Sequence, residues 1–372
     1  MQNYKEKTKI ESIQVIRGVA ALFVVLFHYK SDINNIYAQE NLGDLLFSFG
    51  WIGVDLFFII SGFIIYKSTE IKKPVKEFII KRFFRVYPPY IFCLFLFLFF
   101  YSYINTDLPS ASQLIKSIML VPLNHNDYGP FYGYSVLSVA WTLSYELAFY
   151  FIFAISMHFS HKYRFYISSL IIIISVTTLQ TFYLTDLTFT NVKISTPTTS
   201  NHILSNLFFL ANPIFLEFIA GMMVAKAYYC ISNSFKNTKL SLVIVMLILS
   251  YTTTLILSGH YTSHGFSLYG GALPSLLILI CLIRMESAHN IKMPKAFVFL
   301  GAISYSLYLV HSIVPFIISD IGIEFPDASG FTILVFNLIV SICISICIYT
   351  YIEKPTISAS QKTVVFFYKK IT

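Results

Sequence analysis

The chain has 372 residues, of which 56% are apolar and only 12% are charged, and its mean hydropathy is +0.70. Water-soluble domains carry about a quarter of charged residues, so this composition excludes a soluble globule and indicates a protein covered largely by lipid. A net charge of +8 would suit a nucleic-acid partner. Basic cytoplasmic loops would give the same charge, and the positions of the charges distinguish the two explanations.

Ten apolar stretches are long enough to cross a bilayer, which takes about 20 residues. We expect the spans at 13–30, 51–66, 88–104, 141–158, 165–183, 203–229, 240–258, 268–284, 297–318 and 331–352. The first is expected to be a retained helix, because no small-residue cleavage site follows it. The sequence therefore predicts an all-α membrane protein, a single domain over residues 1–372 with about ten transmembrane helices.

The basic residues orient these spans. An even number of spans places both termini on one side, and 22 of the 26 Lys and Arg fall there. The other side receives Lys30, Lys116 and Lys193, and Arg17 lies inside the first span. Cytoplasmic loops are enriched in Lys and Arg, so we predict that both termini are cytoplasmic. Orientation in the membrane explains the positive charge without nucleic acid.

The loop 105–140 is the one long connection on the predicted outer side. It contains a polar and aromatic stretch with Tyr128, Phe131 and Tyr132. These rings could stack on sugar rings of a substrate, or they could belong to the aromatic belt at the membrane interface. Long loops in compact proteins are often functional, so Tyr128 and Tyr132 are candidate acceptor-site residues.

Two ionisable residues of the first span share one helix face. Arg17 and His28 are 11 residues apart, which at 3.6 residues per turn is close to three full turns and about 16 Å along the axis. Ionisable groups inside a membrane are costly and usually functional. The alternative is an arginine that reaches the headgroups and a histidine satisfied in the core. The shared face predicts that the pair lines an interior passage.

Three further ionisable residues are expected at the depth of His28. Asp55 lies one turn into the second span, Glu146 lies just over one turn into the fourth, and His311 lies in the outer half of the ninth. Buried carboxylates are usually paired, and a carboxylate beside a histidine fixes its tautomer and makes it a better base. The cluster could also be a structural device for helix packing.

Arg82 and Arg85 stand one turn apart near the cytoplasmic end of the third span, just before Pro88 and Pro89. Two adjacent guanidinium groups suit phosphate binding, although basic residues are common at such helix ends. The prolines fit the beginning of the span. The five cysteines form no metal-ligand spacing, and we expect no metal site.

Six motifs occur in order along the chain. They are Arg17-Gly18-Val19-Ala20 with His28; Trp51-Ile52-Gly53-Val54-Asp55 and the apolar run to Phe63; Arg82-x-x-Arg85-x-x-Pro88; Trp141-Thr142-Leu143-Ser144-Tyr145-Glu146; Ile303 to His311; and Ile352-Glu353-Lys354-Pro355. Together they resemble the acyltransferase-3 family of bacterial membrane O-acyltransferases. The family more often has Ser where this chain has Thr142.

The resemblance implies transfer of an acyl group, usually acetyl from acetyl-CoA, to a hydroxyl of a cell-surface saccharide. His28 would be the general base or would carry the acyl group, with Glu146 or Asp55 orienting its ring. Arg17, Arg82 and Arg85 would bind the acyl-CoA, a co-substrate rather than a bound cofactor. The acceptor site could include Trp141 and His311.

The same resemblance implies a stand-alone enzyme of the bacterial inner membrane. Its expected partners are acyl-CoA, a saccharide or glycolipid acceptor and the lipid bilayer. A secondary transporter or flippase would also bury acidic, basic and histidine side chains along a passage, and a non-catalytic membrane receptor is a third class. An inverted repeat would favour a transporter, and none is visible in the sequence.

Overall fold

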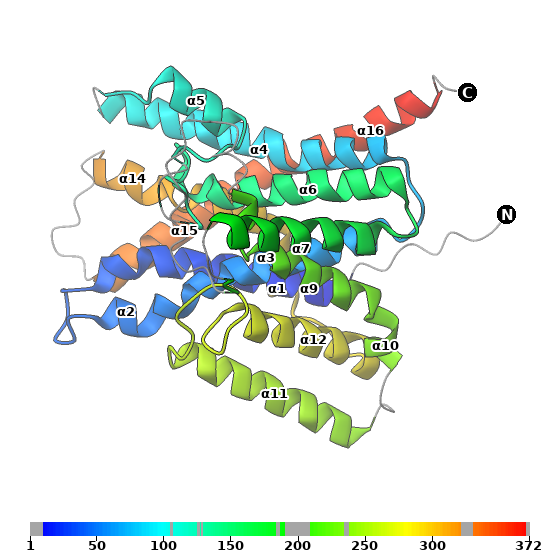
Figure 1. Ribbon diagram of the computed structural model, residues 1–372. Coiled ribbons are helices and arrows are strands. Elements are labelled where there is room, and N and C mark those ends of the chain that lie inside the picture. The colour runs from blue at the N-terminus through cyan, green and yellow to red at the C-terminus, as the bar shows by residue number, and fades with distance from the viewer. Residues whose placement is uncertain are drawn as a thin grey trace.

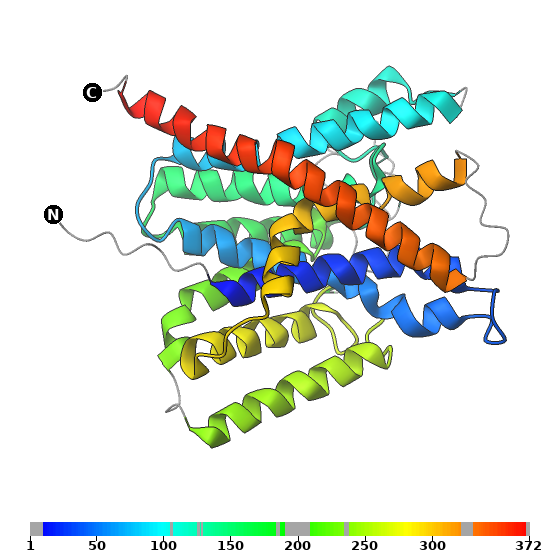
Figure 2. The ribbon, with the colours of Figure 1, turned by 180° about the vertical axis from the view of Figure 1, so that it is seen from behind.

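The computed structural model describes residues 10–104, 107–124, 127, 129–183, 187–189, 209–233, 238–320 and 330–369. Over these ranges the chain folds into helices and forms no β-strand, which confirms the predicted all-α class (Figures 1 and 2). The helices are α1 (Glu11–Tyr29), α2 (Leu42–Phe47), α3 (Ile52–Ser68), α4 (Val75–Ile104), α5 (Ala111–Ile118), α6 (Trp141–Phe159), α7 (Arg164–Tyr183), α9 (Phe215–Lys226), α10 (Tyr228–Asn233), α11 (Lys239–Leu257), α12 (Ala272–His289), α13 (Lys295–Val310), α14 (Ile313–Asp320), α15 (Gly330–Ile348) and α16 (Lys354–Lys369).

Seven helical segments of the described chain are long and apolar enough to cross a membrane, so the molecule is a multi-pass membrane protein. They are Glu11–Ile33, Leu42–Ser68, Val75–Tyr103, Ser138–Phe159, Arg164–Phe182, Lys239–Leu257 and Gly330–Phe366. The predicted number of about ten is not confirmed. The three predicted spans outside this set, 203–229, 268–284 and 297–318, overlap α9, α12, and α13 with α14.

The end of helix α12 holds the start of α1 in place. Its last turns carry Arg284 and Glu286. The Glu286 carboxylate accepts hydrogen bonds from the backbone N–H groups of Glu11 (2.7 Å) and Ser12 (2.9 Å). These donors begin α1 and have no partner inside their own helix. A carboxylate there also opposes the positive end of the helix dipole, so Glu286 fixes where α1 starts.

Helix α4 begins 13 residues before Pro88, at Val75, so the predicted helix start at the prolines is wrong. Pro88 and Pro89 lie inside a 30-residue helix. Proline in a helix interior removes a backbone hydrogen bond, but a long apolar helix packed against others tolerates it. As a result, Arg82 and Arg85 project from regular helix and not from a loop before it.

Glycines allow two helix pairs to pack backbone against backbone. A Cβ atom at Gly221 of α9 would lie 1.8 Å from the carbonyl oxygen of Ile59 in α3, and one at Gly62 would lie 2.1 Å from that of Phe218. A Cβ atom at Gly301 of α13 would likewise meet α1, 1.9 Å from the Gln14 carbonyl oxygen. Small residues are the usual means of close helix approach in membranes.

Replacing Gly221 by alanine is expected to lower the thermal unfolding midpoint of the detergent-purified protein. The added methyl group cannot fit without separating α3 from α9, and such overpacking costs about 1–3 kcal/mol. Met223→Leu, on the exposed side of the same helix, is the control and should leave the midpoint unchanged. A Gly221→Ala midpoint equal to that of the control would contradict the packing described here.

We name the two ends of the helix bundle after the residues of α1 that lie there. The Arg17 end is where α1 begins, and the His28 end is where α1 ends. The last turns of α16 also lie toward the Arg17 end (Figures 1 and 2). That this end faces the cytoplasm stays a prediction.

Candidate active site

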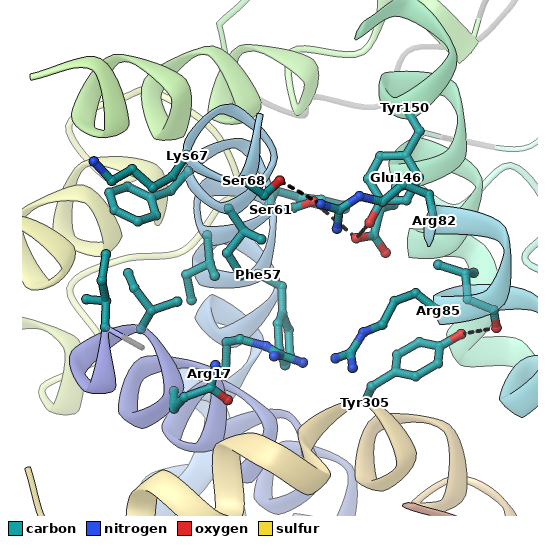
Figure 3. Close-up of a pocket in the computed structure, with 18 of the residues that line it drawn as sticks. Arg17, Phe57, Ser61, Lys67, Ser68, Arg82, Arg85, Glu146, Tyr150 and Tyr305 are labelled. Atoms are coloured by element: carbon teal, nitrogen blue, oxygen red, sulfur yellow. Dashed lines mark hydrogen bonds between the residues drawn. The ribbon is translucent and has the colours of Figure 1, made fainter. Parts of the chain in front are cut away.

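A cavity of about 710 Å³ reaches into the bundle from the Arg17 end. This volume lies within the roughly 300–1,000 Å³ typical of small-molecule sites. Gln14, Lys67, Glu70 and Tyr229 line the part nearest that end, and Thr142 and Tyr308 belong to the lining at greater depth. Arg17, Arg82, Arg85 and Glu146 all line the cavity (Figure 3). The structure thus brings together the three predicted donor-binding arginines and one predicted catalytic carboxylate.

Glu146 is fixed inside this cavity. Its carboxylate accepts a hydrogen bond from Ser61 of α3 at 3.1 Å and another from the hydroxyl of Tyr150, one turn along α6. Figure 3 shows Arg82 beside this group. No described contact joins Glu146 to His28, so the predicted role of orienting that ring is not supported. Glu146 lies within a cation-lined chamber instead.

Arg85 has fewer hydrogen-bond donors available for a phosphate than predicted, because a carboxylate already binds it. Its guanidinium forms an ion pair of 2.6 Å with Glu353, a carboxylate that is fully buried. The other oxygen of Glu353 accepts a hydrogen bond from Ser306 of α13 at 2.7 Å. The Arg85 guanidinium also lies 5.8 Å from the centre of the Tyr305 ring. Arg85 therefore links α4 to α13 and to the short π-helix Tyr349–Glu353 that precedes α16, while one side of it faces the cavity.

Arg17 is the cation best placed to meet a ligand. Its guanidinium points into the cavity toward that of Arg85 (Figure 3), and no carboxylate of the described chain lies within ion-pair distance of it. Arg82 is partly engaged, since it donates to the Ser68 hydroxyl at 2.9 Å. Neighbouring guanidinium groups with unused donors favour a phosphate or carboxylate ligand.

Aromatic rings lie between the cavity and the predicted catalytic histidine. The Tyr308 hydroxyl bonds with Thr142 (2.9 Å) and donates to the Val139 carbonyl (3.0 Å), and its ring lies 5.6 Å from that of Phe57. Phe57 and Tyr308 both line the cavity. We call these two residues the aromatic partition. It lies at the deep end of the cavity, toward the His28 end.

His311 lies next to the aromatic partition, and His28 lies against His311. The ring centres of Tyr308 and His311 are 5.6 Å apart, and those of His311 and His28 are 5.0 Å apart. His311 is fully buried, and neither of its ring nitrogens has a hydrogen-bond partner in the described part of the chain. His28 is exposed at the end of α1. The predicted proximity of His28 and His311 is therefore observed.

Asp55 is oriented away from His28, contrary to the proposed role of holding its ring. Its carboxylate contacts His264 and Gly265 in the loop between α11 and α12, and Glu217 of α9 lies beside it. The predicted depth in the membrane groups Asp55 and Glu146 with His28. Depth does not fix the direction in which a side chain leaves its helix, and α3 turns Asp55 toward α9 and α12.

The predicted acceptor residues differ in how much of their rings a ligand could reach. Trp141 is nearly buried between Phe131 and the ring of His264. Tyr132 is fully buried against Phe209, so it offers no face to a sugar and the acceptor role predicted for it is not supported. Its burial follows from the way the loop before α6 folds back onto the core. Tyr128 lies outside the described residues.

His264 and Glu353 are polar partners that sequence reasoning missed. An ionisable side chain indicates function most clearly inside an apolar span, and His264 lies in a loop between two such spans. The signal that could have found it is Asp55, because a buried carboxylate needs a partner and His28 was not its only candidate. From the sequence, Glu353 is only part of a motif, because nothing there shows that α16 packs against α4 and brings Glu353 to Arg85.

Comparison with known proteins agrees with this arrangement. Residues 10–350 match the acyltransferase-3 family, described as an acyltransferase domain, and the chain belongs to this family. A similar protein from Acidianus two-tailed virus, named "Putative acetyltransferase ORF330", is 24% identical over 330 residues, which cover 86% of this chain and 87% of the viral protein. No solved structure matches the chain significantly.

Proposed function

We propose that this protein transfers an acyl group, acetyl in the simplest case, from acyl-CoA to a hydroxyl of a saccharide. The observation that carries the proposal is the cation-lined cavity in which Arg17 points at open space with no ion-pair partner among the described residues. Coenzyme A is a polyanion with a long, narrow arm that ends in the thioester. A deep cavity with arginines and apolar walls suits both of these features.

The donor enters at the Arg17 end, which faces the cytoplasm of a bacterial inner membrane in this proposal. Arg17 and Arg82 bind phosphate groups, and the pantetheine arm extends toward Thr142 and the aromatic partition. The acceptor approaches from the His28 end. Coenzyme A stays a co-substrate and is released after each turnover, so the enzyme needs no resident cofactor.

His28 supplies the proton transfer. Its imidazole takes the proton of the acceptor hydroxyl while the oxygen attacks the thioester carbonyl, and the C–S bond then breaks. The departing thiolate receives the proton back from His28. His311, the adjacent buried ring, positions His28 in this scheme. Exposure of His28 at the end of α1 gives a hydroxyl acceptor access to it.

Purified protein incubated with radiolabelled acetyl-CoA and saccharide acceptors tests the proposal. Labelled saccharide supports an acyltransferase that acts on hydroxyl groups. A transporter or flippase would move substrate across a liposome membrane without labelling it, and that result would overturn the proposal.

Replacing Arg17 by glutamine is expected to raise the KM for acetyl-CoA about 10- to 100-fold, since a hydrogen bond to a charged group contributes about 1.5–3 kcal/mol. The acceptor KM should change little. Lys162→Gln, which removes an exposed positive charge outside the cavity, is the matched control. Equal donor KM values for the two variants would rule out Arg17 as a donor-binding residue.

A further inference from the structure

A second polar centre lies outside the cavity, where the loop between α11 and α12 folds over α3. His264 Nδ1 lies 2.7 Å from one carboxylate oxygen of Asp55, and the backbone N–H of Gly265 donates to the other at 3.1 Å. Asp55 is fully buried, whereas the His264 side chain keeps 15% of its surface exposed. The loop thus uses both oxygens of Asp55 to hold one histidine ring at the surface.

The backbone is shaped to allow this contact. Gly265 adopts a φ of +91°, a conformation that side chains with a Cβ atom rarely take. A Cβ atom at Gly271 would lie 3.0 Å from the Asp55 carboxyl group. The loop also closes on itself, because the Gly271 N–H bonds to the Ser263 carbonyl at 2.9 Å. His264 is therefore held in one orientation, as ligand-binding groups require.

Both tryptophans of the chain surround this histidine. The ring centre of Trp51 lies 4.8 Å from that of His264 at an interplanar angle of 78°, and that of Trp141 lies 6.5 Å away at 69°. Trp51 is partly exposed. With Nδ1 facing Asp55, Nε2 is the ring atom left for a ligand, and no hydrogen bond to it is present within the described ranges.

This centre lies at the same end of the bundle as the proposed reaction site, to which a chain of contacts connects it. Trp141 is followed directly by Thr142, which bonds to Tyr308 of the aromatic partition. Tyr308 in turn contacts His311, which lies against His28. A molecule bound over Trp51 and His264 would therefore occupy the same end of the bundle as His28, on the side of the partition away from the donor cavity.

We propose that Trp51, Trp141 and His264 form a subsite that binds the saccharide acceptor. His264 Nε2 accepts a hydrogen bond from a sugar hydroxyl, and the partly exposed indole ring of Trp51 packs against the apolar C–H face of the pyranose, while the buried ring of Trp141 supports His264 from behind. Asp55 is a positioning residue that fixes the histidine tautomer. This inference rests on the proposed function for the identity of the ligand, but the binding it describes can be measured without acyl transfer.

Tryptophan fluorescence provides that measurement. Because the only two tryptophans lie at the subsite, their emission reports on it directly. Wild-type protein, without any acyl-CoA, is titrated with methyl glycosides of glucose, galactose, mannose, rhamnose and N-acetylglucosamine. We expect a saturable change with at least one of them and at least a tenfold weaker affinity in His264→Gln. His260→Gln, at an exposed histidine of the same loop, should respond like the wild type.

No saturable response from any glycoside, or an unchanged affinity in His264→Gln, would overturn the subsite. Steady-state kinetic constants distinguish an acceptor-binding role of His264 from a purely structural role in the loop. His264→Gln and Trp51→Phe should raise the acceptor KM while the KM for acetyl-CoA stays constant, and a fall in kcat alone would contradict the proposal. If the wild type binds a glycoside but never acylates it, the proposed function fails while the subsite stands.

Discussion

Replacing His28 by alanine is expected to abolish acyl transfer and leave the protein folded and able to bind acetyl-CoA. Loss of a general base typically costs about 10²–10⁴-fold in rate, and loss of an acyl-carrying residue costs at least as much. The side chain is exposed and its described ring contacts are with Phe27 and His311, so little packing is lost. The measurement is the rate of labelled acetyl transfer beside donor binding by calorimetry.

The two roles open to His28 differ in what accumulates without an acceptor. An acyl carrier would leave an acetyl group on the wild-type peptide that contains His28 after incubation with acetyl-CoA, and mass spectrometry would detect it. A general base would leave no such adduct. Full transfer activity in His28→Ala would remove this residue from the mechanism altogether. His158→Ala, on the last turn of α6, is a control for the loss of a histidine.

Replacing Arg85 by alanine is expected to destabilise the protein by about 3–5 kcal/mol, because Glu353 would be left as an unpaired buried charge. The pair joins α4 to the segment between α15 and α16, at 2.6 Å. The loss should appear as a lower midpoint of thermal unfolding in detergent. The loss of stability is expected to be larger than any loss of donor binding, because some of the Arg85 N–H groups already bind Glu353 and are not available to the donor.

The double variant Arg85→Met/Glu353→Gln distinguishes the structural role from the binding role. Removing both charges takes away the unpaired carboxylate, so much of the lost stability should return. If Arg85 also binds the donor, the double variant will recover stability but keep a raised KM for acetyl-CoA. A single Arg85→Ala variant as stable as the wild type would show that the ion pair contributes nothing to the fold.

Composition and hydrophobic periodicity predicted the helical membrane fold because a bilayer makes strict demands on length and polarity. The same criteria predict about ten spans, and seven helical segments of the described chain are long and apolar enough to cross a membrane. Glu286, near the end of α12, accepts a hydrogen bond from the backbone N–H of Glu11 at the start of α1. Helix α13 has only 16 residues. Contacts between distant parts of the chain allow a helix to contain charged residues. Hydropathy averaged over neighbouring residues does not detect such contacts.

The identities of the site residues were more predictable than their partners. Costly ionisable groups pointed to Arg17, Glu146 and Asp55, and the structure places the first two in one cavity. Which carboxylate meets which histidine depends on helix rotation, and a sequence does not fix rotation when most faces of a helix are apolar. Asp55 accordingly pairs with His264 and not with His28.

The glycine contacts bear on how an acyl group could cross the bundle. Alternating-access transporters rock one group of helices against another. Here α1 with α13, and α3 with α9, meet at the level of their backbones, so these pairs are expected to move as rigid units. In the proposed acyltransferase, the passage between donor and acceptor would then open by rotation of the Phe57 side chain, because hydrogen bonds to Thr142 and Val139 hold Tyr308 in place. Opening by side-chain rotation would admit a narrow acyl arm while the membrane stays impermeable to ions.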